Sequence, residues 1–249
     1  MSNVYVSTGK KGVYTYTKKQ MSVLSTSMLT ASIGFIATCL IGYLTQFVLT
    51  QYGDSIATTS LYIISSIGII IGTVLSFVWT FRWQNASLAF GSSIIALYCI
   101  CYGIGFGFLF YSLELSDIIF AFGMVGLITL GSFIVSKVMS VKAAYKFSQM
   151  AFVIGIVGFV IILVCSMVAM FTPIVSTSFK TLFLITSIVS GIISIIYLIY
   201  SLWLAQNMDK FINDAQLSTK LGIFLGFNIL VQIITLTLNM LRFIRYFKN

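Results

Sequence analysis

The chain has 249 residues, of which 59% are hydrophobic and only 8% are charged. A soluble domain of this size could not cover its surface with so few charges, and a membrane β-barrel would show short alternating strands instead of long apolar runs. Composition therefore predicts an all-α integral membrane protein, a bundle of several membrane-spanning helices.

The net charge of +9 comes mainly from lysines in short polar stretches, where they set membrane orientation and meet anionic lipid headgroups. We therefore expect the lipid bilayer as a partner and no nucleic acid. The absence of histidine removes Ser–His catalysis and His–zinc chemistry. The four cysteines all lie within hydrophobic segments and are interpreted as small buried residues. No cofactor, metal site or enzymatic activity is expected.

Seven hydrophobic segments follow one another with short connections, which predicts a single seven-helix transmembrane domain over residues 21–244. A basic cytoplasmic tail is expected at 1–20, and a short basic tail at 245–249. The segments are 21–49, 56–81, 86–111, 118–136, 150–171, 181–206 and 221–244.

The distribution of lysine and arginine predicts a cytoplasmic N-terminus, in what we expect to be a bacterial plasma membrane. The N-terminal tail and alternate loops hold ten basic residues: Lys10, Lys11, Lys18, Lys19, Arg82, Lys137, Lys142, Lys146, Lys210 and Lys220. The opposite loops hold Asp54, Glu114, Asp117 and Lys180. Seven crossings leave Arg242, Arg245 and Lys248 outside, against this bias. Either the other loops outweigh them, or the last segment does not fully cross; we favour seven crossings.

Small residues recur four apart, a spacing that lets helices approach closely in lipid. The pairs are Gly68 with Gly72, Gly103 with Gly107, and Gly222 with Gly226.

The last segment carries a polar residue at nearly every turn of one helical face. These residues are Asn228, Gln232, Thr235, Asn239 and Arg242. The preceding segment does the same with Ser187, Ser190, Ser194, Tyr197 and Ser201. Polar groups in lipid are costly unless they face protein or water. The two stripes therefore predict either a hydrogen-bonded helix interface or a narrow polar path for ions, and spacing alone favours the interface.

The five acidic residues all lie in or beside loops, so none is at the middle of a predicted helix. Proton-coupled pumps usually need an ionisable group at depth, which makes a proton antiporter an unfavourable interpretation. At the end of the second segment, Arg82 is interpreted either as reaching the membrane interface or as pairing with a group inside the bundle.

Three stretches resemble the Bax-inhibitor-motif family (transmembrane Bax inhibitor-like proteins). The run from Gly191 to Ser201, with Tyr197 and Tyr200, resembles that family's glycine-led run ending in Tyr-x-x-Tyr-Asp. The run from Gln232 to Arg242 resembles its Asp-x-x-Asn-Leu-x-x-x-Leu-Leu-Arg ending, and the segment from Tyr145 onward is also similar. The resemblance implies a seven-helix membrane bundle whose last helix is packed centrally.

The family's calcium-leak members use two aspartates that share a proton, one on each of the last two helices. The matching positions here are Ser201 and Gln232, and the acid that opens the fifth helix in the family is matched by Lys146. Serine and glutamine do not titrate near neutral pH, and they lack the anionic oxygens that calcium favours. The resemblance therefore implies the fold without pH gating or strong calcium binding.

Two functions are weighed. The first is a passive, pH-insensitive leak path for calcium or another cation, lined by Ser194, Tyr197, Ser201, Asn228, Gln232, Thr235 and Asn239. Arg82 or Arg242 would limit cation passage electrostatically. The second is a non-transporting membrane protein that modulates a membrane-bound protease or another membrane partner, as some relatives in that family are thought to do.

Overall fold

The computed structural model describes residues 22–52, 58–170, 177–208 and 214–248. Within these ranges the side chains of 52, 58–66, 69, 151, 159, 162, 163, 165–170, 177–180, 183 and 215 are not described. The described backbone forms seven α-helices and contains no strand. The basic tail predicted at 1–20 lies outside the described residues.

Each predicted hydrophobic segment corresponds to one helix. The helices are α1 (Val23–Tyr52), α2 (Thr58–Arg82), α3 (Leu88–Tyr111), α4 (Leu115–Val138), α5 (Val141–Met170), α6 (Thr177–Asn207) and α7 (Ala215–Lys248). The largest differences are at α5 and α7, which extend beyond the predicted 150–171 and 221–244. Hydropathy marks only the lipid-immersed part of a helix, whereas the backbone hydrogen bonds continue into polar turns. Residues 245–248, predicted as a tail, thus form the last turn of α7.

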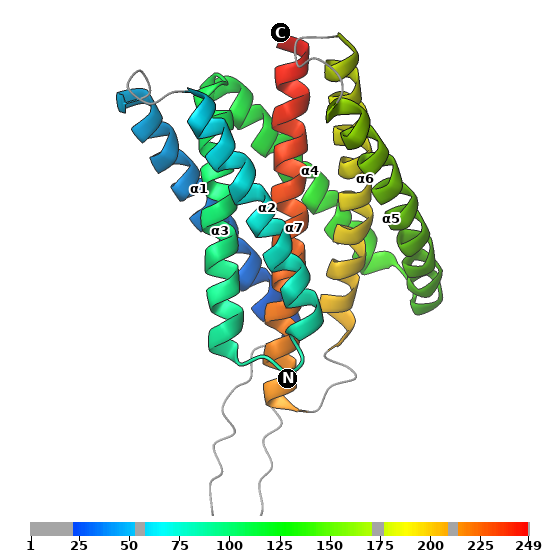
Figure 1. Cartoon of the computed structure of the whole chain (residues 1–249). Coiled ribbons are helices and arrows are strands. Elements are labelled where there is room, and N and C mark those ends of the chain that lie inside the picture. The colour runs from blue at the N-terminus through cyan, green and yellow to red at the C-terminus, as the bar shows by residue number, and fades with distance from the viewer. Residues whose placement is uncertain (1–21, 53–57, 171–176, 209–213, 249) are drawn as a thin grey trace, which may run out of the picture.

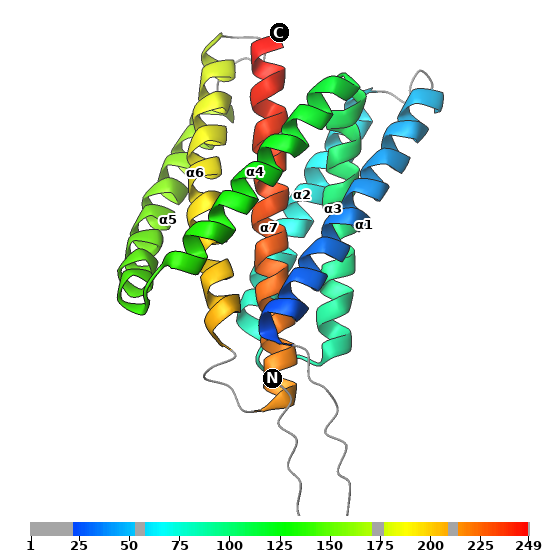
Figure 2. The same ribbon diagram turned by 180° about the vertical axis from the view of Figure 1, so that it is seen from behind.

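Consecutive helices run in alternating directions, and α7 runs through the middle of the bundle (Figures 1 and 2). It packs against α1, α6, α4 and α3, and more slightly against α2. The last helix is therefore central, as predicted. Its first and last turns lie at opposite ends of the bundle, so α7 runs its full length (Figure 1).

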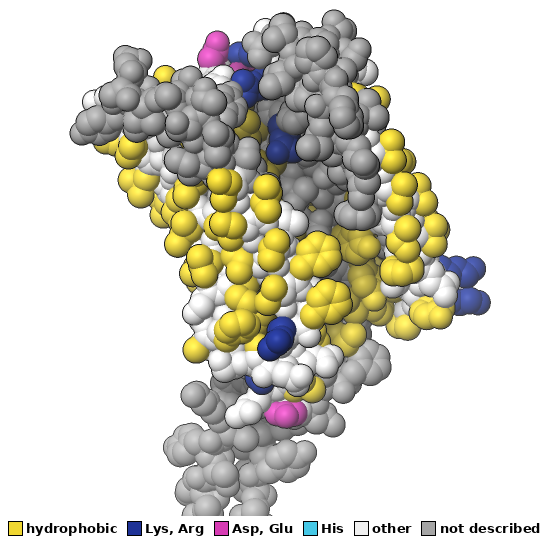
Figure 3. Space-filling view, viewed as in Figure 1, with side chains coloured by type: hydrophobic (Ala, Val, Ile, Leu, Met, Phe, Trp, Pro, Cys, Tyr) yellow, Lys and Arg dark blue, Asp and Glu magenta, His cyan; other side chains and the backbone are white. Residues whose placement is uncertain are grey.

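Five helices of the described residues are long and apolar enough to cross a membrane, judged by length and composition. They are Val23–Gln51, Leu88–Tyr111, Leu115–Val138, Leu184–Asn207 and Gln216–Lys248. The part of α2 with described side chains contributes a shorter apolar stretch, Ile70–Arg82. On the face shown in Figure 3, hydrophobic side chains cover most of the described surface between the two ends of the bundle.

Charged residues gather at the two ends of the bundle. The end where α1 and α7 begin carries Arg82, Lys137, Lys142, Lys146, Lys220 and Asp214, and we call it the basic end. The opposite end carries Glu114, Asp117, Arg245 and Lys248. The other charges used to predict orientation, Asp54, Lys210 and the N-terminal lysines, lie outside the described residues, as does the side chain of Lys180.

The glycine pairs bring helices into close contact, as their spacing predicts. A Cβ atom added at Gly226 would lie 2.6 Å from the carbonyl oxygen of Ser27 in α1. One added at Gly103 would lie 2.6 Å from Cβ of Ile41, also in α1. At Gly68, the added Cβ would lie 3.1 Å from the carbonyl oxygen of Cys101. Glycine at these positions lets α7, α3 and α2 pack backbone to backbone with their neighbours.

A polar seam beside the central helix

The two polar stripes meet at a side-chain hydrogen bond. The Asn239 amide nitrogen of α7 donates to the Ser190 hydroxyl of α6, with 3.1 Å between Nδ2 and Oγ. Asn239 is buried, as are Ser187, Ser194 and Ser201 along α6. The stripes therefore face protein at this level, and the helices that carry them are neighbours. We call Ser190, Ser194, Ser201, Asn228, Gln232, Thr235 and Asn239 the α6–α7 seam.

This hydrogen bond also sets the register between the two helices. α6 and α7 run antiparallel (Figures 1 and 2). Each step of one residue toward the end of α6 is therefore level with a step of one residue toward the start of α7. Counting from Ser190 and Asn239, Ser194 is level with Thr235, and Ser201 is level with Asn228. Gln232 is four residues from the level of Ser201, about 6 Å at about 1.5 Å per residue.

The neighbours of α7 define where its polar face points. Phe224 stacks on Trp83, just beyond the end of α2, with ring centroids 4.6 Å apart. Asn239 binds α6. At 100° per residue, Asn228, Gln232 and Thr235 lie on the same side of α7 as these two residues. The polar face therefore points between α6 and α2, the helix that α7 contacts most slightly.

The middle of the seam holds two amide side chains, Asn228 and Gln232, that are only half-buried. Neither has a hydrogen-bond partner among the described residues of the protein. Thr235 differs, because its hydroxyl donates to the Val231 carbonyl of its own helix at 2.8 Å. Both amides lie in the middle of α7, far from its ends. At that depth in a bilayer, an unsatisfied polar group would cost several kcal/mol. Both amides therefore need a hydrogen-bond partner from outside the described residues.

A second polar group lies one turn beyond Asn239. Arg242 is half-buried and close enough to the Tyr102 phenol of α3 to interact with it electrostatically. The Tyr102 hydroxyl lies 3.2 Å from the Thr73 hydroxyl of α2. Arg242 thus belongs to a polar cluster that joins α7, α3 and α2. Tyr102 gave no signal in the sequence, because it occurs within an apolar, glycine-rich run.

Two of the predicted site residues are directed away from the seam. The Tyr197 hydroxyl lies against α5, 2.6 Å from where a Cβ at Gly155 would be. Arg82 is exposed at the last turn of α2, at the basic end, whereas Arg242 is nearer the opposite end. The two arginines therefore do not act at one place.

The end of α7 is fastened to the start of α4 by an ion-pair cluster. The Lys248 ammonium lies 2.8 Å from Asp117 Oδ2 and 3.1 Å from Glu114 Oε2. Seven crossings place the basic C-terminal residues at the same end of the bundle as Glu114 and Asp117. One of these basic residues, Lys248, is paired with both acids. The charges of Lys248, Asp117 and Glu114 are evident in the sequence, but their pairing is not.

No protein-family model matches this chain, and no curated protein matches it either. Length, composition and the helical bundle define a polytopic integral membrane protein.

Proposed function

We propose that this protein is a Bax-inhibitor-like membrane protein in which the α6–α7 seam forms a passive ion-leak path. The observation that carries the proposal is the Asn239–Ser190 hydrogen bond, which joins two polar stripes beside the central helix. The central position of α7 also supports the resemblance, since that arrangement is the one the resemblance implies.

The path runs along the face of α7 between α2 and α6. Asn228 and Gln232 hold water in the middle of the span, and Thr235 continues the polar line toward Asn239. There the hydrogen bond to Ser190 closes it. Beyond that closure, the positive charge of Arg242 opposes cations, so the leak is slow. With serine and glutamine at positions 201 and 232, the path has no titrating pair and is insensitive to pH.

Reconstitution into liposomes with an enclosed calcium dye tests this function. We expect a slow leak that stays constant from acidic to alkaline pH. Asn239→Ala removes the closing hydrogen bond and raises the leak about threefold, the equivalent of roughly 0.6 kcal/mol. Thr237→Ala is the matched control, because Thr237 is buried and donates to the Ile233 carbonyl of its own helix. A flux no greater than that of protein-free liposomes at every pH would refute the proposal.

Introducing carboxylates tests the correspondence with the family. We expect Ser201→Asp combined with Gln232→Asp to confer a pH-dependent calcium leak, because neighbouring carboxylates raise each other's pKa. The register adds a second combination, Ser201→Asp with Asn228→Asp, in which the acids are level with each other. If both folded double variants keep a flat pH response, the positional correspondence is wrong.

A non-transporting modulator of a membrane-bound protease is the second candidate, and the close packing around the seam favours it. Leu198 of α6 and Leu236 of α7 are almost completely buried, so the seam also acts as a helix–helix contact. Crosslinking and pull-down from native membranes separates the two functions. A stable protease partner together with no ion flux would support the modulator. In both proposals the chain is not an enzyme.

A further inference from the structure

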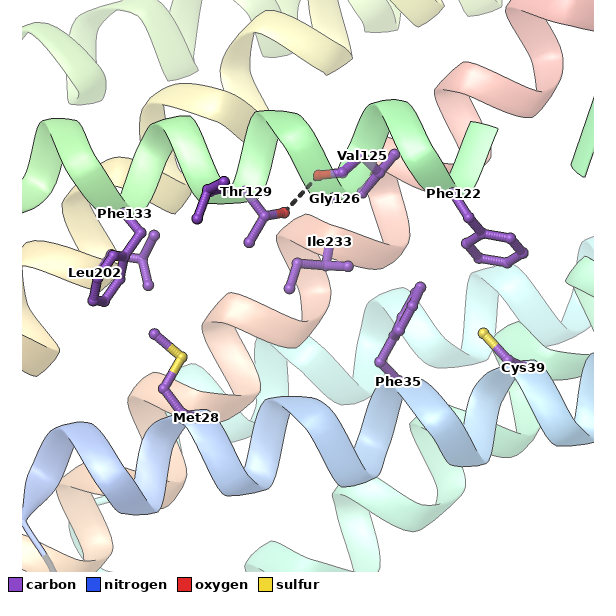
Figure 4. Close-up of a pocket in the computed structure, with 11 residues that line it drawn as sticks. Met28, Phe35, Cys39, Phe122, Val125, Gly126, Thr129, Phe133, Leu202 and Ile233 are labelled. Atoms are coloured by element: carbon purple, nitrogen blue, oxygen red, sulfur yellow. Dashed lines mark hydrogen bonds between the residues drawn. The ribbon is translucent and has the colours of Figure 1, made fainter. Parts of the chain in front are cut away.

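An apolar groove lies on the other side of α7 from the polar seam. It has a volume of about 600 Å³ and runs between α1 and α4, which form its walls. Figure 4 shows Met28, Phe35 and Cys39 along α1, facing the row from Phe122 to Phe133 on α4. Ile233 of α7 and Leu202 of α6 form the floor. This is the volume of a small-molecule site, about 300–1,000 Å³.

The lining offers almost nothing to a polar ligand. No charged residue contributes to it, and its one hydroxyl, that of Thr129, donates to the Val125 carbonyl at 2.8 Å. The groove is also open at the α4 backbone, because a Cβ at Gly126 would have no neighbour within 4 Å. An occupant must therefore be apolar along its whole length, and slender.

The groove has the length of half a bilayer. It follows α4 from Phe122 to Phe133, about 16 Å at about 1.5 Å per residue. The hydrocarbon core of a membrane is about 30 Å thick, so one leaflet contributes about 15 Å. At the inner end, the rings of Phe35 and Phe122 meet edge to face with centroids 5.7 Å apart and narrow the groove. Its length is thus suited to one acyl chain that enters from one leaflet.

The outer end of the groove lies toward the basic end of the bundle. Met28, Phe133 and Leu202 are grouped there (Figure 4), each about 7 Å from the end of its own helix, at about 1.5 Å per residue. This is the depth at which an acyl chain begins below its headgroup. The other end of the groove lies at Cys39, in the middle of α1, where the chain would end.

A basic side chain follows directly on the groove face of α4. Lys137 comes one turn after Phe133, on the face that carries Phe122, Gly126 and Thr129. It is exposed and forms no salt bridge among the described residues. Lys142 and Lys146 add positive charge at the same end. The groove therefore has an apolar body and a positive mouth, which complement an anionic phospholipid.

We propose that the groove between α1 and α4 binds one acyl chain of an anionic phospholipid from the leaflet at the basic end, with its phosphate at Lys137. A gap of this size beside lipid-facing helices does not stay empty, because its walls lose dispersion contacts until a chain fills it. The binding is independent of ion flux, so it stands or falls separately from the proposed function.

The test uses the full-length protein in vesicles of phosphatidylcholine containing phosphatidylglycerol with a photoreactive acyl chain. After irradiation, mass spectrometry of peptides locates the crosslinks. We expect them to concentrate on α1 from Met28 to Cys39 and on α4 from Phe122 to Phe133. Gly126→Trp fills the groove and should lower this crosslinking several-fold. Gly131→Trp is the matched control, because Gly131 is also exposed and without neighbours but points away from the groove.

Lys137→Gln tests the headgroup contact. Its loss should lower the preference for phosphatidylglycerol over a phosphatidylcholine probe with the same chain about fivefold, the effect of one basic side chain at an anionic surface. Lys142→Gln, at the same end but off the groove face, should change it less. Label spread evenly over all lipid-facing helices would overturn the proposal, as would equal labelling of the Gly126→Trp and Gly131→Trp variants. Crosslinks to a second copy of the chain through the groove would assign it to self-association instead and also overturn it.

Discussion

The two sides of α1 differ in how closely the chain packs, although both are rich in small residues. Toward α3 and α7, its backbone is in contact with glycines, and a Cβ at Gly222 would lie 2.7 Å from Cβ of Thr26. Toward α4 the helices stand apart, and the glycines of α4 meet no neighbour. A Cβ atom added at Gly126, on the groove face of α4, would have nothing within 4 Å.

A glycine in a membrane helix thus permits close packing but does not cause it. Lipid chains are as apolar as leucine, so two helices associate in the bilayer only where their surfaces fit or form hydrogen bonds. Gly226 fits against the backbone of Ser27, and the seam has its hydrogen bond at Asn239. Between α1 and α4 neither condition holds, and lipid is the better neighbour.

The largest loss of stability is expected from disrupting the close packing of α1 against α7. Gly226→Leu forces a side chain into the Ser27 backbone, which cannot rotate away as a side chain could. We expect a loss of about 3 kcal/mol in the free energy of unfolding, at the upper end for an overpacked core. Thermal unfolding of the purified protein in detergent micelles measures it.

Gly126→Leu is the control on the loose side, where the new side chain meets open space. Both substitutions gain the same helix propensity, so their difference reports packing alone. The control should change stability by less than about 0.5 kcal/mol. Equal losses in the two variants would mean that the two sides of α1 do not differ in packing.

Much of this fold could be predicted from the sequence because the signals are local. Long apolar runs located all seven helices, and the four-residue glycine spacing indicated the close approaches at Gly103 and Gly226. The ends of α5 and α7 were predicted too short because polar turns carry no hydropathy signal. The groove was not predicted, since the row from Phe122 to Phe133 has the same periodicity whether its face meets a helix or lipid.

The candidate site was predictable to a similar degree. The stripes on α6 and α7 are local patterns, so Asn239 and Ser201 could be singled out from spacing. Which residues of α6 and α7 lie at the same level depends on the register between the two helices, and no local sequence pattern specifies that register. For the same reason, the electrostatic interaction of Arg242 with Tyr102 and the ion pair of Lys248 with Asp117 could only be found in three dimensions.

A medium effect is expected at the seam, which is held by a hydrogen bond instead of close backbone contact. In a double-mutant cycle, Asn239→Ala and Ser190→Ala should show a coupling of about 0.6 kcal/mol in unfolding free energy. The cycle removes the separate effect of each substitution. A coupling of zero would contradict the register, and with it the alignment of Ser201 with Asn228.

The smallest effect is expected at the ion pairs that join α7 to α4. Lys248→Glu replaces attraction to Asp117 and Glu114 by repulsion and should lower the unfolding temperature slightly, more so at low salt. Adding Asp117→Lys to Lys248→Glu should restore it, because the exchanged charges pair again. Lys142→Glu, at the other end and without a salt bridge among the described residues, is the control.

Lys248→Glu should also change the side of α1 that faces α4. α4 packs against α6 and α7 and makes few contacts with α1, so the Lys248 pairs help to hold its first turn beside α7. When Lys248→Glu releases that turn, α4 should move away from α1 at the inner end of the groove, where Phe35 and Phe122 meet. Crosslinking of acyl chains to the groove should then increase, while the glycine contacts of α3 and α7 with α1 stay intact. Unchanged crosslinking would mean that the Lys248 pairs do not determine where α4 lies.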